Sequence, residues 1–417
     1  PYMLGTNGGA AFLLIYILFM IFLGIPVMVT EFFIGRYSRS NTVGSFKKMA
    51  PGTKWCWIGY NGILAAFLIL GFYAVVSGWT LEYVWQTVNG NLYSTPRVAF
   101  TAGIDNFSSN ALRPIFWTAV FIGLTHFVIA SGVEKGIERA SKIMMPLLFF
   151  ILVVMCVRSV TLPNAEAGLV YLFKPDFSKL TSSVVLSAVG QAFFSLSLGM
   201  GTMITYGSYI PKHENMFRMA TTIAITDTCV AILAGLAIFP AVFSYGINPT
   251  SGPELVFITL PTVFGNMAGG YVLGILFFFL LFTASISSSV SLLEVATLYI
   301  SEEMHLRRRT ATLIAVVVVA ALSSLCLWSQ LPDSSLRVLG MNIFDLFNNL
   351  TSLYMLPLGG LLSVLFAGWF MRNKTLQDEV TSRGRYGSSI YPYYRVIVRF
   401  VAPVVIVLLF LDQLNVI

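Results

Sequence analysis

The chain has 417 residues, of which 57% are hydrophobic and only 10% are charged, and its formal net charge is +7. Soluble domains carry about 25% charged residues. This composition, with a mean hydropathy of +0.81, excludes a soluble enzyme, a nucleic-acid-binding module and a disordered regulator. The apolar segments are long and lack the alternation of barrel strands, so we expect an all-α polytopic membrane protein.

Ten segments have the roughly 20 mostly apolar residues that a bilayer span needs. We predict spans at residues 10–37, 58–89, 112–131, 143–160, 182–210, 216–246, 270–300, 309–328, 341–371 and 392–412. Short connections join them, which predicts a single transmembrane domain over residues 1–417. The chain begins at Pro1 with neither an initiator Met nor a signal-peptide pattern. We therefore expect the start of a first helix to lie before Pro1.

Basic residues in the connections indicate the orientation of the chain. If the connection after the first full span is cytoplasmic, about three-quarters of the 25 Lys and Arg residues fall on that side. This bias predicts a cytoplasmic N-terminus and a C-terminus outside. The positive net charge therefore reflects orientation and does not predict a nucleic-acid partner.

Polar residues interrupt several spans. Tyr73 lies near the middle of the 58–89 span, which is too deep for an interfacial aromatic residue. Two serines and two glycines lie within Phe193–Gly201, in the middle of the 182–210 span. Each glycine weakens a helix by about 1 kcal/mol relative to alanine. This segment alone fits equally a close-packed seam of small residues and an unwound helix whose free carbonyls coordinate a cation.

Three later spans carry acids or clustered hydroxyls. Asp227 is costly inside a span unless it binds a cation or forms a structural hydrogen bond to a neighbouring helix. In the segment Thr283–Ser291, Ala284, Ser287 and Ser288 share one helical face and offer hard oxygen ligands that suit Na⁺, although small-residue packing also explains them. Glu294 follows at membrane depth. Asp345 begins its helix, where an acid complements the helix dipole.

Several motifs resemble one known family. The segment Gly24–Arg36 (GIPVMVTEFFIGR) resembles the second-helix signature of the neurotransmitter:sodium symporters, which have the LeuT-type fold. Further segments resemble the same family in the same order along the whole chain: PYMLGTNGGAAF at the start, EKGIERASKIMMP (Glu134–Pro146), LFKPDF (Leu172–Phe177), GQAFFSLSLGMG (Gly190–Gly201) and AILAGLAIFP (Ala231–Pro240). The resemblance implies two inverted five-helix repeats with broken helices at the midplane, in the eleven-helix bacterial branch.

The resemblance also implies a set of site residues. The substrate site would comprise Ile69, Tyr73, Phe194, Ser195, Ser197, Met200, Ser288 and Leu292. Sodium site one would use Ser195 and Asp227, with Thr226 in place of Asp227 under another alignment. Sodium site two would use the Ala284 carbonyl, Ser287 and Ser288. The outer gate would use the acid Asp345, with Gln191 beside it, and the inner gate would pair Tyr209 with Glu302. A helix-five element between Gly136 and Pro146 would unwind when the inside opens. The family's unwound part of helix one and its gate arginines would lie before Pro1.

The expected function is sodium-coupled symport of a neutral, hydrophobic or aromatic amino acid across the bacterial inner membrane by alternating access. Asp227 would supply a negative charge and make transport chloride-independent. The expected ligands are Na⁺, an amino acid and membrane lipid, and the sequence leaves a homodimer open. A non-transporting sensor or scaffold on the same fold is the alternative. An enzyme is disfavoured, because the serines at 287–289 have no histidine at comparable depth.

Overall fold

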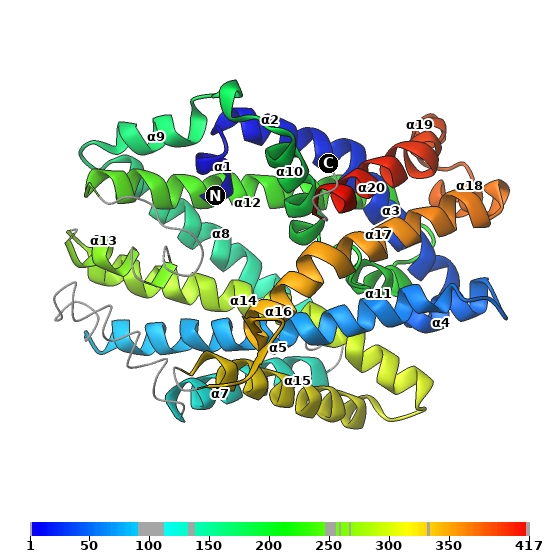
Figure 1. The fold of residues 1–417 in the computed structure, drawn as a ribbon, viewed down its shortest axis with the longest axis horizontal. Helices are drawn as coiled ribbons and strands as arrows, with labels where there is room; N and C mark the ends of the chain where they lie inside the picture. The colour runs from blue at the N-terminus through cyan, green and yellow to red at the C-terminus, as the bar shows by residue number, and fades with distance from the viewer. Residues whose placement is uncertain are drawn as a thin grey trace.

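A computed structural model describes residues 2–90, 112–131, 138–246, 256–257, 260–266, 268–331 and 334–413. Its long helices run side by side along the longest axis of the molecule (Figure 1). Within the described residues, nine helices are long and apolar enough to cross a membrane. They confirm the predicted all-α architecture and correspond to nine of the ten predicted spans.

The first half of the described chain contains four of the nine membrane-length helices. The elements are α1 (Tyr2–Thr6), α2 (Ala10–Phe19), the π-helical turn η1 (Met20–Gly24), α3 (Ile25–Ser38), α4 (Thr42–Met49), α5 (Cys56–Val88), α7 (Leu112–Ala130), α8 (Arg139–Val160), α9 (Ala165–Phe173), the 3₁₀ turn η3 (Phe177–Lys179), α10 (Ser182–Ser195) and α11 (Thr202–Tyr209). The predicted 182–210 span is therefore two shorter helices.

The second half adds two very long helices and a C-terminal pair. The elements are α12 (Met216–Ser244), α13 (Leu260–Asn266), α14 (Gly270–Glu303), α15 (Arg308–Gln330), strands β1 (Arg337–Val338) and β2 (Met341–Asn342), α16 (Ile343–Asn349), the π turn η5 (Leu350–Met355), α17 (Leu356–Leu365), the π turn η6 (Phe366–Phe370), α18 (Asn373–Val380), α19 (Tyr391–Val396), the π turn η7 (Ile397–Val401) and α20 (Ala402–Gln413). The two strands form an antiparallel hairpin that leads into α16.

Three of the π-helical turns have the same cause in the sequence. Pro26, Pro357 and Pro403 each stand second in the α-helical segment that follows η1, η5 and η7. A proline has no N–H to donate, and its ring crowds the carbonyl four residues earlier. A widened turn relieves this conflict without ending the helix, so these spans remain continuous.

The packing around α11 positions the site. This short helix lies against α3, and the two backbones meet at glycines. A Cβ added to Gly35 would lie 1.9 Å from the Ile204 carbonyl oxygen, and one added to Gly207 would lie 2.8 Å from that of Phe32. Such a close approach fixes α11 against α3 along its length. The long helices α5 and α14 pack against each other beside it.

Candidate functional site

The helix interruption between α10 and α11 is the central feature of the site. Residues 196–201 are not helical, and Ser197, Gly199 and Gly201 have φ values of 54°, 78° and 78°. Among the described residues, the carbonyls of Leu196, Ser197 and Leu198 accept no backbone hydrogen bond. The structure thus bears out the unwound-helix interpretation of this segment and leaves carbonyl oxygens free within the membrane-spanning region.

Two neighbouring helices hold the interruption in place. The Gly199 N–H donates to Oε1 of Glu31 on α3 over 2.8 Å, and the Glu31 side chain is fully buried. On the opposite side, a Cβ at Gly199 would lie 1.9 Å from the carbonyl oxygen of Leu356 on α17. Only glycine fits this position. Sequence reasoning missed the role of Glu31, although an acid in the 10–37 span was a signal for it.

Asp227 on α12 reaches the end of α10. The Ser195 hydroxyl donates to Asp227 Oδ2 over 2.6 Å, and the Tyr16 hydroxyl donates to the same oxygen over 3.2 Å. Thr226 is exposed and makes no such contact. The structure therefore brings Asp227, and not Thr226, to Ser195. Tyr16 was missed because a single tyrosine in an apolar helix carries no distinguishing signal.

The predicted apolar wall is largely assembled. Ile69, Met200 and Leu292 are buried in one hydrophobic cluster, and Tyr73 packs against it. The Tyr73 hydroxyl interacts with the side chain of Ser288. Three chain segments that lie far apart in sequence thus meet here: α5, the end of the interruption, and α14.

The other predicted site residues are not members of this hydrophobic cluster. Phe194, at the end of α10, is 39% exposed, and Ser197 is half-buried in the interruption. On α14, Ala284 and Ser287 are half-buried and Ser288 is exposed. The spacing of these three residues keeps them on one helical face, as predicted.

The two predicted outer-gate residues, Gln191 and Asp345, have different surroundings. Gln191 lines a cavity of about 340 Å³ together with Tyr16 and Ser195. Asp345 instead interacts with Asn342, whose side chain donates to Asp345 Oδ2 over 2.8 Å and accepts from the Asp345 N–H over 2.7 Å. The placement of Gln191 beside Asp345 stays a prediction. Asp345 is held in the first turn of its own helix, which is the simpler of the two explanations that its position suggested.

The predicted inner-gate pair also differs from the structure. The Tyr209 hydroxyl donates to Glu294 Oε1 over 2.6 Å, and Glu294 forms a bidentate ion pair with Arg308. The physical reason is position along α14: Glu294 lies two turns before Glu302 and faces α11. Glu294, which the sequence marked as an acid at membrane depth, therefore takes the contact expected for Glu302.

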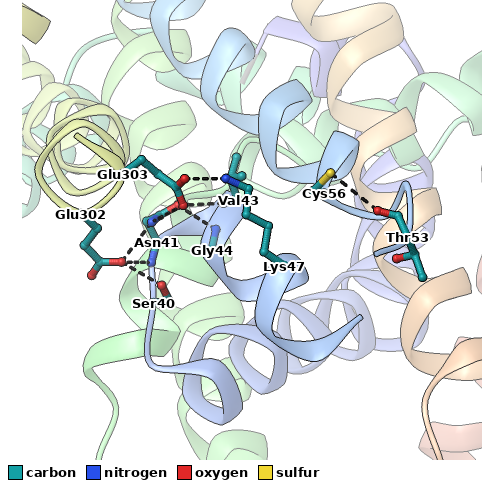
Figure 2. Close-up of polar contacts among 9 residues, drawn as sticks. All are labelled: Ser40, Asn41, Val43, Gly44, Lys47, Thr53, Cys56, Glu302 and Glu303. Carbon is teal, nitrogen blue, oxygen red and sulfur yellow. Dashed lines mark hydrogen bonds and ion pairs between the residues drawn. The ribbon is translucent and has the colours of Figure 1, made fainter. Parts of the chain in front are cut away.

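Glu302 binds the segment before α4 instead (Figure 2). Its Oε2 accepts hydrogen bonds from the Ser40 hydroxyl over 2.8 Å and from the Asn41 N–H and side-chain amide over 2.8 and 3.0 Å. Asn41 also caps α4 by accepting from the N–H groups of Val43 and Gly44. One asparagine thus starts a helix and ties it to α14. An asparagine immediately before a helix was the available signal.

A second contact joins the same elements. Lys47 on α4 forms an ion pair of 2.5 Å with Glu303, which Figure 2 shows beside Asn41. The hydrogen bond to Glu303 raises the pKa of Lys47 above its usual value.

In the predicted helix-five element, Pro146 lies inside the continuous helix α8, and Gly136 lies outside the described residues.

The fold and this arrangement define a class of protein: a multi-pass helical membrane protein with a broken helix at its centre. The sequence matches the model of the sodium:neurotransmitter symporter family over residues 1–99 and 93–417. The chain belongs to this family. Its members are sodium-coupled transporters and not enzymes, which agrees with the absence of a catalytic pattern in the sequence.

Individual relatives give the same result. The sodium-dependent transporter YhdH of Bacillus subtilis is 36% identical over 416 residues, which cover 100% of this chain and 92% of the relative. The sodium-dependent serotonin transporter of Drosophila melanogaster is 28% identical over 83% of this chain and 63% of its own length. The crystal structure of MhsT in complex with L-phenylalanine matches with 42% identity and a TM-score of 0.91, over 99% of this chain and 93% of that one. This likeness confirms the predicted LeuT-type fold.

Proposed function

We propose that the protein couples the sodium gradient to uptake of a neutral amino acid with a hydrophobic or aromatic side chain. The observation that carries this proposal is the meeting of the unwound segment with the apolar wall of Ile69, Met200 and Leu292. Free backbone carbonyls beside hydroxyls can bind the polar end of an amino acid, while an uncharged wall accepts its side chain. The phenylalanine bound to the related MhsT supports the same substrate class.

In this proposal Tyr73 and Ser288 bind the substrate at the polar edge of the wall, with Ser195 and Ser197 on the unwound segment and Phe194 covering the site. Sodium site one uses Ser195 and Asp227, and sodium site two uses the Ala284 carbonyl with Ser287 and Ser288. All of these are oxygen ligands, which suit a hard cation such as Na⁺.

Chloride independence rests on Asp227. Its carboxylate already receives hydrogen bonds from Ser195 and Tyr16 at 2.6 and 3.2 Å, so a fixed negative charge stands beside the proposed first sodium. A transporter with this charge needs no bound anion to offset sodium. Replacement of chloride by gluconate should leave uptake unchanged, and stimulation of uptake by chloride would overturn this part of the proposal.

Alternating access in this proposal uses different closures on the two sides. Gln191 and Asp345 lie on the outer route, and Glu302 and Tyr209 close the inner route through separate partners, Asn41 and Glu294. Unwinding of α8 between Gly136 and Pro146 would open the inside. The bias of basic residues supports a cytoplasmic side at α4 and α18, in the inner membrane of a bacterium.

The test is uptake of radiolabelled phenylalanine and leucine into proteoliposomes, driven by an inward sodium gradient or by a potassium gradient of equal size. We expect accumulation only with sodium, with loss in Tyr73→Phe and Ser288→Ala. Trp57→Phe, an exposed position on the same helix as Tyr73, is the matched control and should transport normally. Sodium-dependent binding without accumulation would overturn symport and favour a sensor, and preference for a charged amino acid would overturn the assignment of the wall.

A further inference from the structure

An arginine inside the last membrane-spanning helix lacks a counter-charge. Arg399 lies eight residues into the span Tyr391–Asp412, or about 12 Å along the helix from its start. Among the ion pairs in the described part of the chain, none includes Arg399. Its Nε is buried and also has no partner there. Because an arginine side chain does not lose its proton in proteins, this position carries a permanent positive charge.

The surroundings hold the guanidinium in one place. Arg399 Cζ lies 4.4 Å from the ring centre of Trp369 and 5.5 Å from that of Phe400. The Trp369 indole N–H donates to the Arg399 carbonyl oxygen over 2.9 Å, which fixes the ring to the backbone of η7. A Cβ added to Gly368 would lie 3.1 Å from Arg399 Cα, so the two π turns η6 and η7 meet nearly backbone to backbone. The guanidinium is therefore positioned by a built contact and is not a free side chain.

The site opens toward lipid at a basic end of the molecule. Trp369 and Phe400 are 55% and 51% exposed, and both belong to helices long and apolar enough to cross a membrane. Two further arginines lie at the same end: Arg395, one helical turn before Arg399, and Arg372, three residues after Trp369. Neither forms an ion pair within the described chain. Figure 1 shows this end, with α18 and α19 at its tip.

We propose that Arg399, stacked on Trp369, binds the phosphate of an anionic phospholipid in the leaflet nearest α18 and α19. An uncompensated arginine within a span is costly, and a phosphate supplies both the missing charge and paired acceptors for the planar guanidinium. Arg395 and Arg372 add charge that favours an anionic lipid over a zwitterionic one, and basic pockets between helices bind such headgroups in other membrane proteins. The exposed rings of Trp369 and Phe400 then lie along the glycerol and upper acyl chain.

The test measures lipid at Trp369 directly and does not depend on transport. The protein is placed in bilayers of phosphatidylcholine mixed with brominated phosphatidylglycerol, or with brominated phosphatidylcholine, and the Trp369 signal is isolated by subtracting the matching Trp369→Phe protein. We expect phosphatidylglycerol to be favoured at this tryptophan by about fivefold or more, as one arginine near the membrane surface supplies. Arg399→Gln should remove most of that preference, and Arg395 and Arg372 supply what remains.

Arg385→Gln is the matched control. Arg385 also lies over an aromatic ring, 5.2 Å from the ring centre of Tyr386, but it belongs to the connection outside the span. The preference for phosphatidylglycerol should remain in this variant. Equal quenching by the two lipids in the unsubstituted protein, or a preference of unchanged size in Arg399→Gln, would overturn the proposal and leave Arg399 as an arginine that only extends toward water. Loss of sodium-driven uptake would test the proposed function separately and would not affect this readout.

Discussion

Two regions differ in how many of their polar groups have hydrogen-bond partners within the protein: the unwound segment between α10 and α11, and the end of α14. At the unwound segment, three successive carbonyls accept no backbone hydrogen bond from any described residue, and Ser288 is exposed. At the end of α14, one oxygen of Glu302 receives three hydrogen bonds from Ser40 and Asn41 (Figure 2). The first region thus leaves polar groups without a protein partner among the described residues, whereas in the second the protein itself supplies the partners. Ligand binding and closure of the α4 end therefore rest on separate sets of contacts, which substitutions can perturb one at a time.

The largest effect is expected from Gly199→Ala in the unwound segment. The added Cβ would lie 1.9 Å from the Leu356 carbonyl oxygen, and φ is 78°. The conformation alone costs an L-residue about 1–2 kcal/mol, and a clash with backbone that cannot move adds several more. We expect loss of folded protein, measured as yield of the monodisperse species and as the thermal unfolding midpoint in detergent.

Gly52→Ala separates the two causes. Gly52 has φ of 75°, and a Cβ added there would meet no atom within 4 Å. Its substitution therefore carries the conformational cost without the clash. We expect this variant to fold with a stability loss of about 1 kcal/mol. Equal behaviour of the two variants would contradict the view that contact with α17 fixes the interruption.

The next effect is expected at the proposed sodium ligand Asp227. The change Asp227→Asn preserves the shape of the side chain and removes its charge, and hydrogen bonds to charged groups contribute about 1.5–3 kcal/mol. The sodium concentration that gives half-maximal substrate binding should therefore rise by about 10- to 100-fold. Thr226→Val, at the exposed neighbouring position, should leave it unchanged. An unaltered sodium dependence in Asp227→Asn would remove Asp227 from the site.

A smaller loss is expected when the ion pair between Glu294 on α14 and Arg308 on α15 is broken. Glu294 is fully buried and Arg308 is 28% exposed, so Glu294→Gln leaves a partly shielded guanidinium without its partner. We expect the free energy of unfolding to fall by about 2 kcal/mol, less than for a fully buried pair. Glu303→Gln, which breaks the exposed pair with Lys47, should change it by no more than about 0.5 kcal/mol. A double variant with Arg308→Met should recover part of the loss, and its failure to do so would assign the effect to Tyr209.

Sequence patterns predicted the features that depend on local chemistry. Length and hydropathy predicted nine helices that the structure confirms. The glycines at 199 and 201 marked the place where the remaining predicted span, 182–210, is interrupted. The spacing of Ala284, Ser287 and Ser288 placed them on one face without knowledge of the fold. The choice of Asp227 over Thr226 combined the family resemblance with the preference of a cation site for a carboxylate; the structure brings Asp227 to Ser195, and the sodium role stays a prediction.

Patterns could not predict contacts between distant segments. Glu294 and Glu302 both lie on α14, and which of them meets Tyr209 depends on the height at which α11 packs against α3. That height is set by close backbone contacts at Gly35 and Gly207, which no sequence period reveals. Asp345 differs from these acids, because its partner Asn342 lies only three residues away, at the start of the same helix.

The smallest effect is expected at Asn41. Its substitution weakens the contact between α4 and the end of α14 without changing any proposed binding residue. Asn41→Ala removes the cap of α4 and a hydrogen bond to Glu302, at a cost of about 1 kcal/mol. Hydrogen exchange by mass spectrometry should therefore speed up by about fivefold in α4 and in the last turns of α14 together. Asn215→Ala removes a comparable cap from α12, and its effect should remain in the first turns of that helix. If exchange becomes faster in α4 but does not change in α14, the Asn41 N–H and the Ser40 hydroxyl hold Glu302 without the Asn41 side-chain amide. The cap of α4 and the contact between α4 and α14 would then be independent.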